Sequence, residues 1–241
     1  MSDAILDKVR KLLAKAENPA CTEAEARAFT DKAAELIAKY GIDTALLAAA
    51  DPSVDPVGDL ILDIPAPYAL DKCALLAGVA EVLRCRTVRR QRWDGERKTF
   101  AVHLFGHDSD LRRVELLYTS LLVQAGYALV GQRVPDFESV AAYRRSWLAG
   151  FTRAVVVRLR SAEERAAAEA DRGGGPSVAL VLADRGVEVA RRMAEVYPRL
   201  RFAGPRRLAG SGMAHGYAAG QRADLGGARV APRAGSPALD A

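Results

Sequence analysis

Arginines are the side chains of this 241-residue chain that offer the most chemistry. Many of them lie in residues 137–160, FESVAAYRRSWLAGFTRAVVVRLR, which have the period of an amphipathic helix. At about 100° per residue, Tyr143 and Trp147 fall on one apolar face, and Arg144 falls in the middle of the same face. A guanidinium in that position needs a carboxylate or a phosphate as its partner, because an unpaired buried charge is strongly destabilising.

Two interpretations of Arg144 remain open at this point. In the first, it forms a structural ion pair with Asp108, Asp110 or Glu115 of the preceding predicted helix, or its long stem lets the charge reach solvent. In the second, it belongs to an anion site, since a guanidinium binds phosphate through two parallel hydrogen bonds. The residues that this phosphate or nucleic-acid site would use are Arg144, Arg145, Arg90 and Arg92, with Trp93 as a stacking face for bases.

Histidines offer a second candidate chemistry. His103 and His107 are four residues apart, the spacing at which a helix presents two metal ligands, and Asp108 follows directly. The alternation around His103 indicates a strand, however, with His107 in the turn after it, and the glutamate of an HExxH motif is absent. Asp108 is also expected to cap the next helix. A metal-assisted hydrolase centred on these three residues is the alternative function, whereas the main interpretation requires no cofactor.

Charge distribution, more than the net charge of +5, favours an acidic partner such as nucleic acid. Residues 84–160 hold fifteen basic and seven acidic side chains, whereas residues 1–50 hold seven basic and eight acidic ones. The positive charge is therefore concentrated later in the chain, where it can form a phosphate-facing surface. Arginine outnumbers lysine by 28 to 7 and alanine is abundant, which is also the composition that a GC-rich genome produces.

Cysteine usage and hydropathy favour a cytoplasmic protein without a membrane partner. Cys21, Cys73 and Cys85 have no metal-binding spacing, which is typical of reduced thiols. No apolar run approaches the roughly 18 residues that a membrane helix needs. The first residues lack the apolar block of a signal peptide.

The elements that must position these residues begin with a helical hairpin in residues 3–43, interrupted by Asn18-Pro19. Gly41 predicts the end of its second helix. Because two short helices are not stable alone, the hairpin must dock on the rest of the chain or on a partner protein. Residues 44–58, rich in proline, aspartate and alanine, are interpreted as a linker.

The main domain, residues 59–226, is predicted to hold a small, mainly antiparallel sheet of three or four strands. Leu60–Ile64 is one strand, and Asp94-Gly95 joins residues 84–93 and 98–105 into a hairpin. The first strand of this hairpin alternates arginines with little to bury, which predicts an edge strand with one solvated face. The chain as a whole is thus predicted to be α+β, a helical hairpin followed by a small sheet with several helices covering one face.

The remaining segments are predicted from periodicity and composition. Gly216, Ala219 and Gly220 have a small-residue spacing that indicates close helix packing. The tail, residues 227–241, has the glycine, alanine, proline and arginine content of a disordered segment. The other predicted elements are helices over residues 68–83, 108–131, 138–171, 186–197 and 213–223, and a short strand-type run at Val178–Leu182.

Several stretches resemble a known family. Residues 6–43, LDKVRKLLAKAENPACTEAEARAFTDKAAELIAKYGID, resemble the N-terminal module of the bacterial and phage family called domain of unknown function 2786. Three later stretches are similar to the second domain that commonly follows this module: LFGHDSDLRRVELLY (104–118), YRRSWLAGF (143–151) and GYAAGQRADLGG (216–227). The resemblance implies an architecture and no activity, so no catalytic residue is carried over from it.

Overall fold

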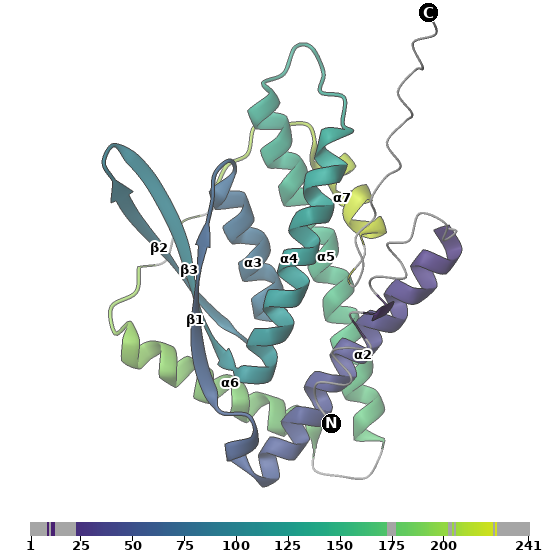
Figure 1. Cartoon of the computed structure of the whole chain (residues 1–241), viewed down its shortest axis with the longest axis vertical. Helices are drawn as coiled ribbons and strands as arrows, with labels where there is room; N and C mark the ends of the chain where they lie inside the picture. Colours follow the sequence, from purple (N-terminus) through teal and green to yellow (C-terminus); the bar gives the residue numbers. More distant parts are fainter. Residues whose placement is uncertain are drawn as a thin grey trace, which may run out of the picture.

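The computed structural model describes residues 23–172, 177–201 and 206–223, together with residues 9, 11, 12, 204 and 225. Within these residues the fold is α+β (Figure 1). Most of the predicted first helix and the predicted disordered tail lie outside the described residues. The described elements are α2 (Glu23–Ala50), η1 (Pro52–Val54), β1 (Val57–Ile64), α3 (Ala69–Val82), β2 (Arg86–Asp94), β3 (Arg97–His107), α4 (Asp108–Val130), α5 (Val140–Asp171), α6 (Val178–Val196) and α7 (Met213–Arg222).

The sheet has three antiparallel strands in the order β1-β3-β2. The prediction of a small antiparallel sheet is confirmed, whereas the sequence did not predict the strand order. β1 pairs with β3 from Val57 opposite His107 to Ile64 opposite Phe100. β2 pairs with β3 through the hairpin turn, where Gly95 adopts a φ of +58° that favours glycine. The predicted hairpin is therefore confirmed, and β2 is the edge strand that its alternating arginines indicated.

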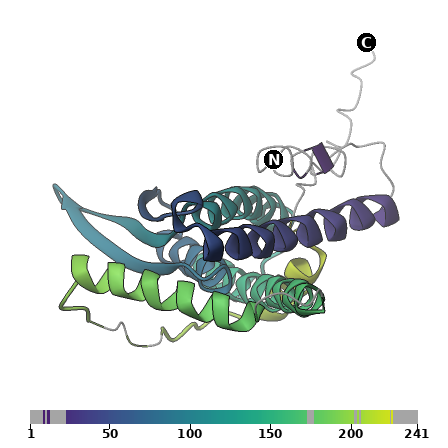
Figure 2. The same ribbon diagram turned by 90° about the horizontal axis from the view of Figure 1, so that it is seen from below.

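Helices cover both faces of the sheet near its centre, so the prediction that they cover only one face is wrong. Val102 and Leu104 of β3 point to one face, where they join the main core with α3 and α4. His103 and Phe105 point to the other face, where the ring of Tyr197 contacts both. The helix α6 runs along this face of the sheet (Figure 2).

The helical part of the core is built around α5, which packs against α2, α3 and α7. Trp147 and Phe151 of α5 are fully buried and stack with their ring centroids 5.4 Å apart. A Cβ on Gly216 of α7 would overlap the carbonyl oxygen of Trp147, so only glycine allows the two helices to approach this closely. The predicted close packing of the small residues is confirmed. Within the described residues, none of the helices combines the length and apolarity that a bilayer crossing requires.

The predicted end of a helix at Gly41 is wrong, because α2 continues through Gly41 to Ala50. A Cβ on Gly41 would overlap the guanidinium of Arg113, so the glycine serves the approach of α4 rather than a helix stop. Residues 44–50, interpreted as part of a linker, are the last turns of α2, and β1 begins at Val57.

The predicted strand at Val178–Leu182 is also wrong, since these residues form the first turns of α6. Val178 and Val189 are buried, whereas Leu180 and Val187 are exposed on the opposite side of the helix. This spacing is helical. A short apolar run does not distinguish a strand from a helix when its partners are unknown.

Six charged side chains, buried or half-buried, form a network at the start of α4, and their formal charges sum to zero. Asp110 is its centre, with Arg113 at 2.8 Å, Arg185 at 3.1 Å and Arg84 at 3.9 Å. Burial alone would raise the pKa of Asp110, but the three guanidiniums outweigh burial and lower it. The members of this network are Asp55, Arg84, Asp110, Arg113, Glu163 and Arg185.

The N-terminus of α4 is capped from a distant segment. Asp55 accepts a hydrogen bond from the backbone N–H of Ser109 at 2.8 Å and another from its hydroxyl at 2.6 Å. The carboxylate of Asp55 thus caps the helix. The sequence predicted this role for Asp108, and that prediction is wrong. An anion at this position is also stabilised by the helix dipole.

Candidate nucleic-acid interface

The strands β2 and β3 extend past the end of β1 as a two-stranded ribbon. The last pair between β1 and β3 is Ile64 with Phe100, so the end of the hairpin pairs only with itself. Figure 1 shows this hairpin reaching away from the helices, at the upper left. We call residues 86–99 the basic ribbon.

The basic ribbon carries six basic side chains and two acidic ones, a formal charge of +4. In the described part of the chain, no carboxylate forms an ion pair with any of its arginines. Their charge is therefore uncompensated and creates a positive potential around the hairpin. The basic residues are Arg86, Arg89, Arg90, Arg92, Arg97 and Lys98, and the acidic ones are Asp94 and Glu96.

Trp93 lies near the end of the basic ribbon and is 66% exposed. It pairs across the hairpin with Lys98, whose Nζ lies 5.2 Å from the centre of the indole ring. This cation–π contact holds a positive charge beside an exposed aromatic face. Arg90 and Arg92 belong to the opposite face of the ribbon, because neighbouring residues of a strand alternate. Both faces thus offer cationic groups.

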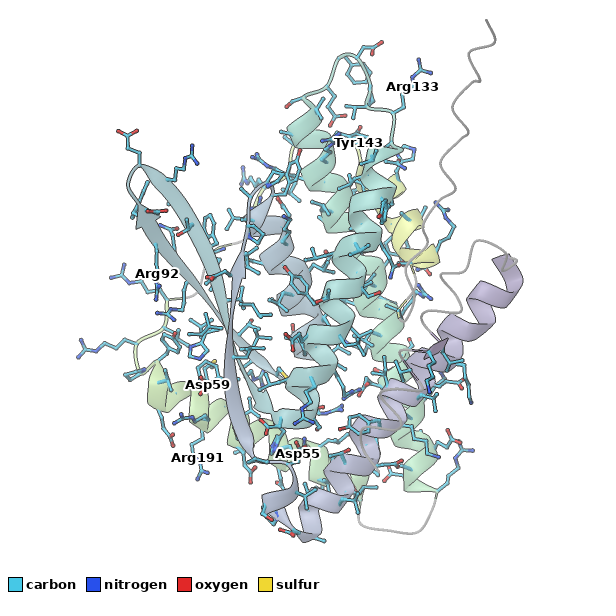
Figure 3. All side chains as sticks on the ribbon, in the orientation of Figure 1. Asp55, Asp59, Arg92, Arg133, Tyr143 and Arg191 are labelled. Atoms are coloured by element: carbon cyan, nitrogen blue, oxygen red, sulfur yellow. The ribbon has the colours of Figure 1, made fainter. Side chains whose placement is uncertain are left out.

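Arg144 and Arg145 lie elsewhere in the molecule. They occupy the start of α5, which packs on α3 rather than along the hairpin. Figure 3 shows Tyr143, their neighbour, well separated from Arg92. The structure therefore places Arg90, Arg92 and Trp93 on one hairpin, with the two arginines on one face and Trp93 on the other. The two arginines of α5 lie outside this group.

No structural ion pair of Arg144 with Asp108, Asp110 or Glu115 is formed. Arg144 is half-buried, and among the described residues its Nε has no hydrogen-bond partner. Asp110 is bound instead by the guanidiniums of Arg84, Arg113 and Arg185. The helical wheel therefore selected an arginine that does not bind this carboxylate.

The fully buried arginine is Arg113 of α4, which the sequence analysis missed. It donates to Asp110 at 2.8 Å and to Glu163 of α5. Burial would lower the pKa of Arg113, but these two carboxylates raise it. The Asp110–Arg113 spacing of three residues was the available signal, since residues three apart meet on a helix.

Arg158, the other arginine near the apolar face of α5, has a structural role. Its guanidinium donates to the carbonyl oxygen of Gly220 at 3.1 Å and to that of Ala223. These carbonyls lie at the C-terminal end of α7, where helix carbonyls lack partners within the helix. Arg158 therefore helps hold α7 on α5.

Each ring nitrogen of His103 has a hydrogen-bond partner. Its Nε2 lies 2.9 Å from Asp59 of β1, and its Nδ1 lies 2.9 Å from the hydroxyl of Tyr197. The hydrogen bond from His103 lowers the pKa of Asp59. This arrangement ties β1 and β3 to the end of α6 and leaves neither ring nitrogen available for a metal.

His107 is the last residue of β3, not part of a turn as predicted. Its Nδ1 donates to the backbone carbonyl of Asp55 at 2.7 Å, and its Nε2 lies 3.5 Å from Glu188. No set of three or more His, Cys, Asp or Glu side chains within the described ranges is placed to hold a metal. The metal-hydrolase alternative on His103, His107 and Asp108 thus receives no support from this geometry.

Comparison with known proteins gives one match. No curated protein and no solved structure matches the chain. The family model that matches is described as "Protein of unknown function (DUF2786)", and it covers residues 4–44. The resemblance of the N-terminal segment is thereby confirmed, and residues 4–44, which include the first part of α2, match the DUF2786 family.

Proposed function

We propose that this is a non-enzymatic nucleic-acid-binding protein and that the basic ribbon is its contact surface. One observation carries the proposal: an exposed hairpin presents arginines that form no ion pair with the described part of the chain, on a strand whose tip holds an exposed tryptophan. Arginines contact phosphates through charge-assisted hydrogen bonds, and an aromatic ring provides a stacking face for a base. The proposal includes a cytoplasmic location, where nucleic acid is accessible.

Single-stranded nucleic acid is the form that the basic ribbon fits best. Stacking on Trp93 requires a base whose face is free, which a duplex interior does not offer. Duplex DNA remains a necessary comparison, because its major groove can also admit a two-stranded ribbon.

The test compares two pairs of arginines by fluorescence anisotropy. Labelled single-stranded DNA, single-stranded RNA and duplex DNA of mixed sequence are titrated with the full chain at low salt. The Arg90→Ala, Arg92→Ala double variant is expected to weaken single-strand binding about tenfold or more, because two phosphate contacts are lost. Trp93→Ala should weaken binding to single strands more than binding to the duplex.

The matched control is the Arg144→Ala, Arg145→Ala double variant. It removes the same charge from a site away from the basic ribbon, so its affinity should stay close to that of the wild type. The proposal is wrong if the wild type binds none of the three nucleic acids at low salt. It is equally wrong if both double variants lose the same affinity, since binding would then follow total charge alone.

A further inference from the structure

A pocket of about 310 Å³ lies at the other end of β3 from the tip of the basic ribbon. It is bounded by the last turns of α2, by the segment that leads into β1, and by α6. One wall is apolar and is formed by Ala45, Ala48, Ala49 and Pro52. The opposite wall is polar and holds His107, Asp184 and Glu188.

His107 presents an unused acceptor at this pocket. The side chain is only 5% exposed, and its Nδ1 must carry a proton because its partner, the carbonyl of Asp55, can only accept. In the neutral ring, Nε2 therefore carries a lone pair. This buried atom has no hydrogen-bond partner in the part of the chain that the structure describes.

A charged group close to this lone pair is another acceptor. The Oε2 of Glu188 lies 3.5 Å from His107 Nε2. Two acceptors facing each other are satisfied only by a donor that reaches both, or by protonation of the ring. A ligand ammonium supplies three such donors and a positive charge.

The surroundings of the pocket favour a cation. Asp184 and Glu188 are one helical turn apart on α6, and neither pairs with a Lys or Arg side chain among the described residues. The last turn of α2 contains no basic residue, so the negative end of its dipole is also uncompensated.

Arg185 does not oppose a cation, because its charge is already balanced. Its Nη2 donates to Asp55 at 2.7 Å and to Asp110 at 3.1 Å. Its Nε and Nη1 have no hydrogen-bond partner within the described residues. An oxygen on the ligand would accept from these N–H groups, so an amino alcohol should fit at least as well as a plain amine.

We propose that this pocket binds a small aliphatic amine, whose ammonium donates to His107 Nε2 and to Glu188 while its carbon chain lies on the alanine wall. The inference does not depend on the proposed nucleic-acid contact, since the pocket and the ribbon tip lie at opposite ends of β3 and share no residue.

The test is a titration of the full ¹⁵N-labelled chain followed by NMR. The probes are n-butylamine and 4-amino-1-butanol, with 1-butanol and butyrate as neutral and anionic comparisons of similar length. The two amines are expected to cause saturable shifts at the backbone amides around Val57 and along residues 184–188. The alcohol and the carboxylate should cause none.

Glu188→Gln keeps the size of the side chain and removes the charge, and we expect it to weaken amine binding about tenfold or more. Glu195→Gln is the matched control, because Glu195 lies on the same helix and outside the pocket. Glu188 is more exposed than His107, so we expect Glu188→Gln to leave the fold intact. His107→Gln provides a second variant. The inference is overturned if neither amine shows saturable shifts, if 1-butanol binds as well, or if Glu188→Gln and Glu195→Gln bind equally.

Discussion

Asp110 is fully buried at the start of α4 and faces guanidiniums from three different parts of the chain. Replacing it by asparagine would leave Arg113 and Arg185 each with fewer carboxylate partners in the interior. Breaking a buried ion pair from one side costs about 3–5 kcal/mol, because the remaining charge is uncompensated. We expect Asp110→Asn to lower the free energy of unfolding by an amount in this range, measured by urea denaturation.

Glu115→Gln is the control for this variant. Glu115 lies on the same helix but is exposed, so its substitution should change the free energy of unfolding by less than about 0.5 kcal/mol. Equal effects of the two substitutions would show that the network contributes no more than a surface charge.

The lowered pKa of Asp110 also predicts a pH dependence. The pKa of Asp110 is lower in the folded than in the unfolded chain, so the unfolded state binds more protons in acid. The free energy of unfolding therefore decreases as the pH decreases. The contribution is fully present above the unfolded pKa of about 3.9 and is lost as pH falls toward the folded value. The stability difference between wild type and Asp110→Asn should therefore narrow by up to about 1.4 kcal/mol per pH unit below about pH 4. Urea midpoints of both proteins at pH 7, 4 and 3 measure this stability difference. A difference that stays constant with pH would contradict the prediction.

At the scale of elements, the packing of α7 on α5 depends on a glycine, which has no side chain. A Cβ on Gly216 would overlap the backbone of α5 at Trp147, whereas a Cβ on Gly126 of α4 meets nothing within 4 Å. We expect Gly216→Ala to displace α7, destabilise the protein by about 2 kcal/mol or more, and remove hydrogen-exchange protection from α7.

Gly126→Ala makes the same chemical change in another helix and should have the opposite effect. Alanine loses less backbone entropy than glycine in a helix, so this variant should be more stable by about 0.5–1 kcal/mol. Thermal unfolding of both variants distinguishes a packing requirement from a general effect of the Gly→Ala exchange.

The sequence predicted the elements whose signals are local. The β2–β3 hairpin was predicted because Asp94-Gly95 defines its turn, and the edge position of β2 followed from its alternating arginines. The end of α2 and the start of α6 were predicted wrongly, because the extent of these helices depends on tertiary contacts. Gly41 resembles a helix stop until Arg113 is seen against it.

The candidate site could be predicted only in part for the same reason. The group of Arg90, Arg92 and Trp93 lies on one hairpin, so the sequence identified it. Arg144, the residue from which the candidate site was built, was selected by a helical wheel, which places a residue around its own helix but does not show what the helix packs against. The partner of Arg113 on α5 is 50 residues away, at Glu163, which no local pattern can indicate.

At the scale of the whole molecule, the positive charge of the basic ribbon should appear as salt dependence. Binding of single strands releases counterions, and log K falls with log[salt] by about 0.7 for each phosphate contacted. If Arg90 and Arg92 each contact one phosphate, their double substitution to alanine should reduce this slope by about 1.4. Anisotropy titrations at several salt concentrations measure the slope, and the Arg144→Ala, Arg145→Ala variant should keep the wild-type value. An unchanged slope in the ribbon variant would show that its arginines contact no phosphate.

The neutral network at the start of α4 also constrains how the chain can be made. Its members are spread from Asp55 to Arg185, 130 residues apart, so the carboxylates of Asp55 and Asp110 leave the ribosome well before Arg185 does. A nascent chain that ends before α6 would have to bury these carboxylates with part of their counter-charge missing, which is unfavourable. We therefore expect the end of the core near α4 to remain open during synthesis and to close only when α6 has emerged.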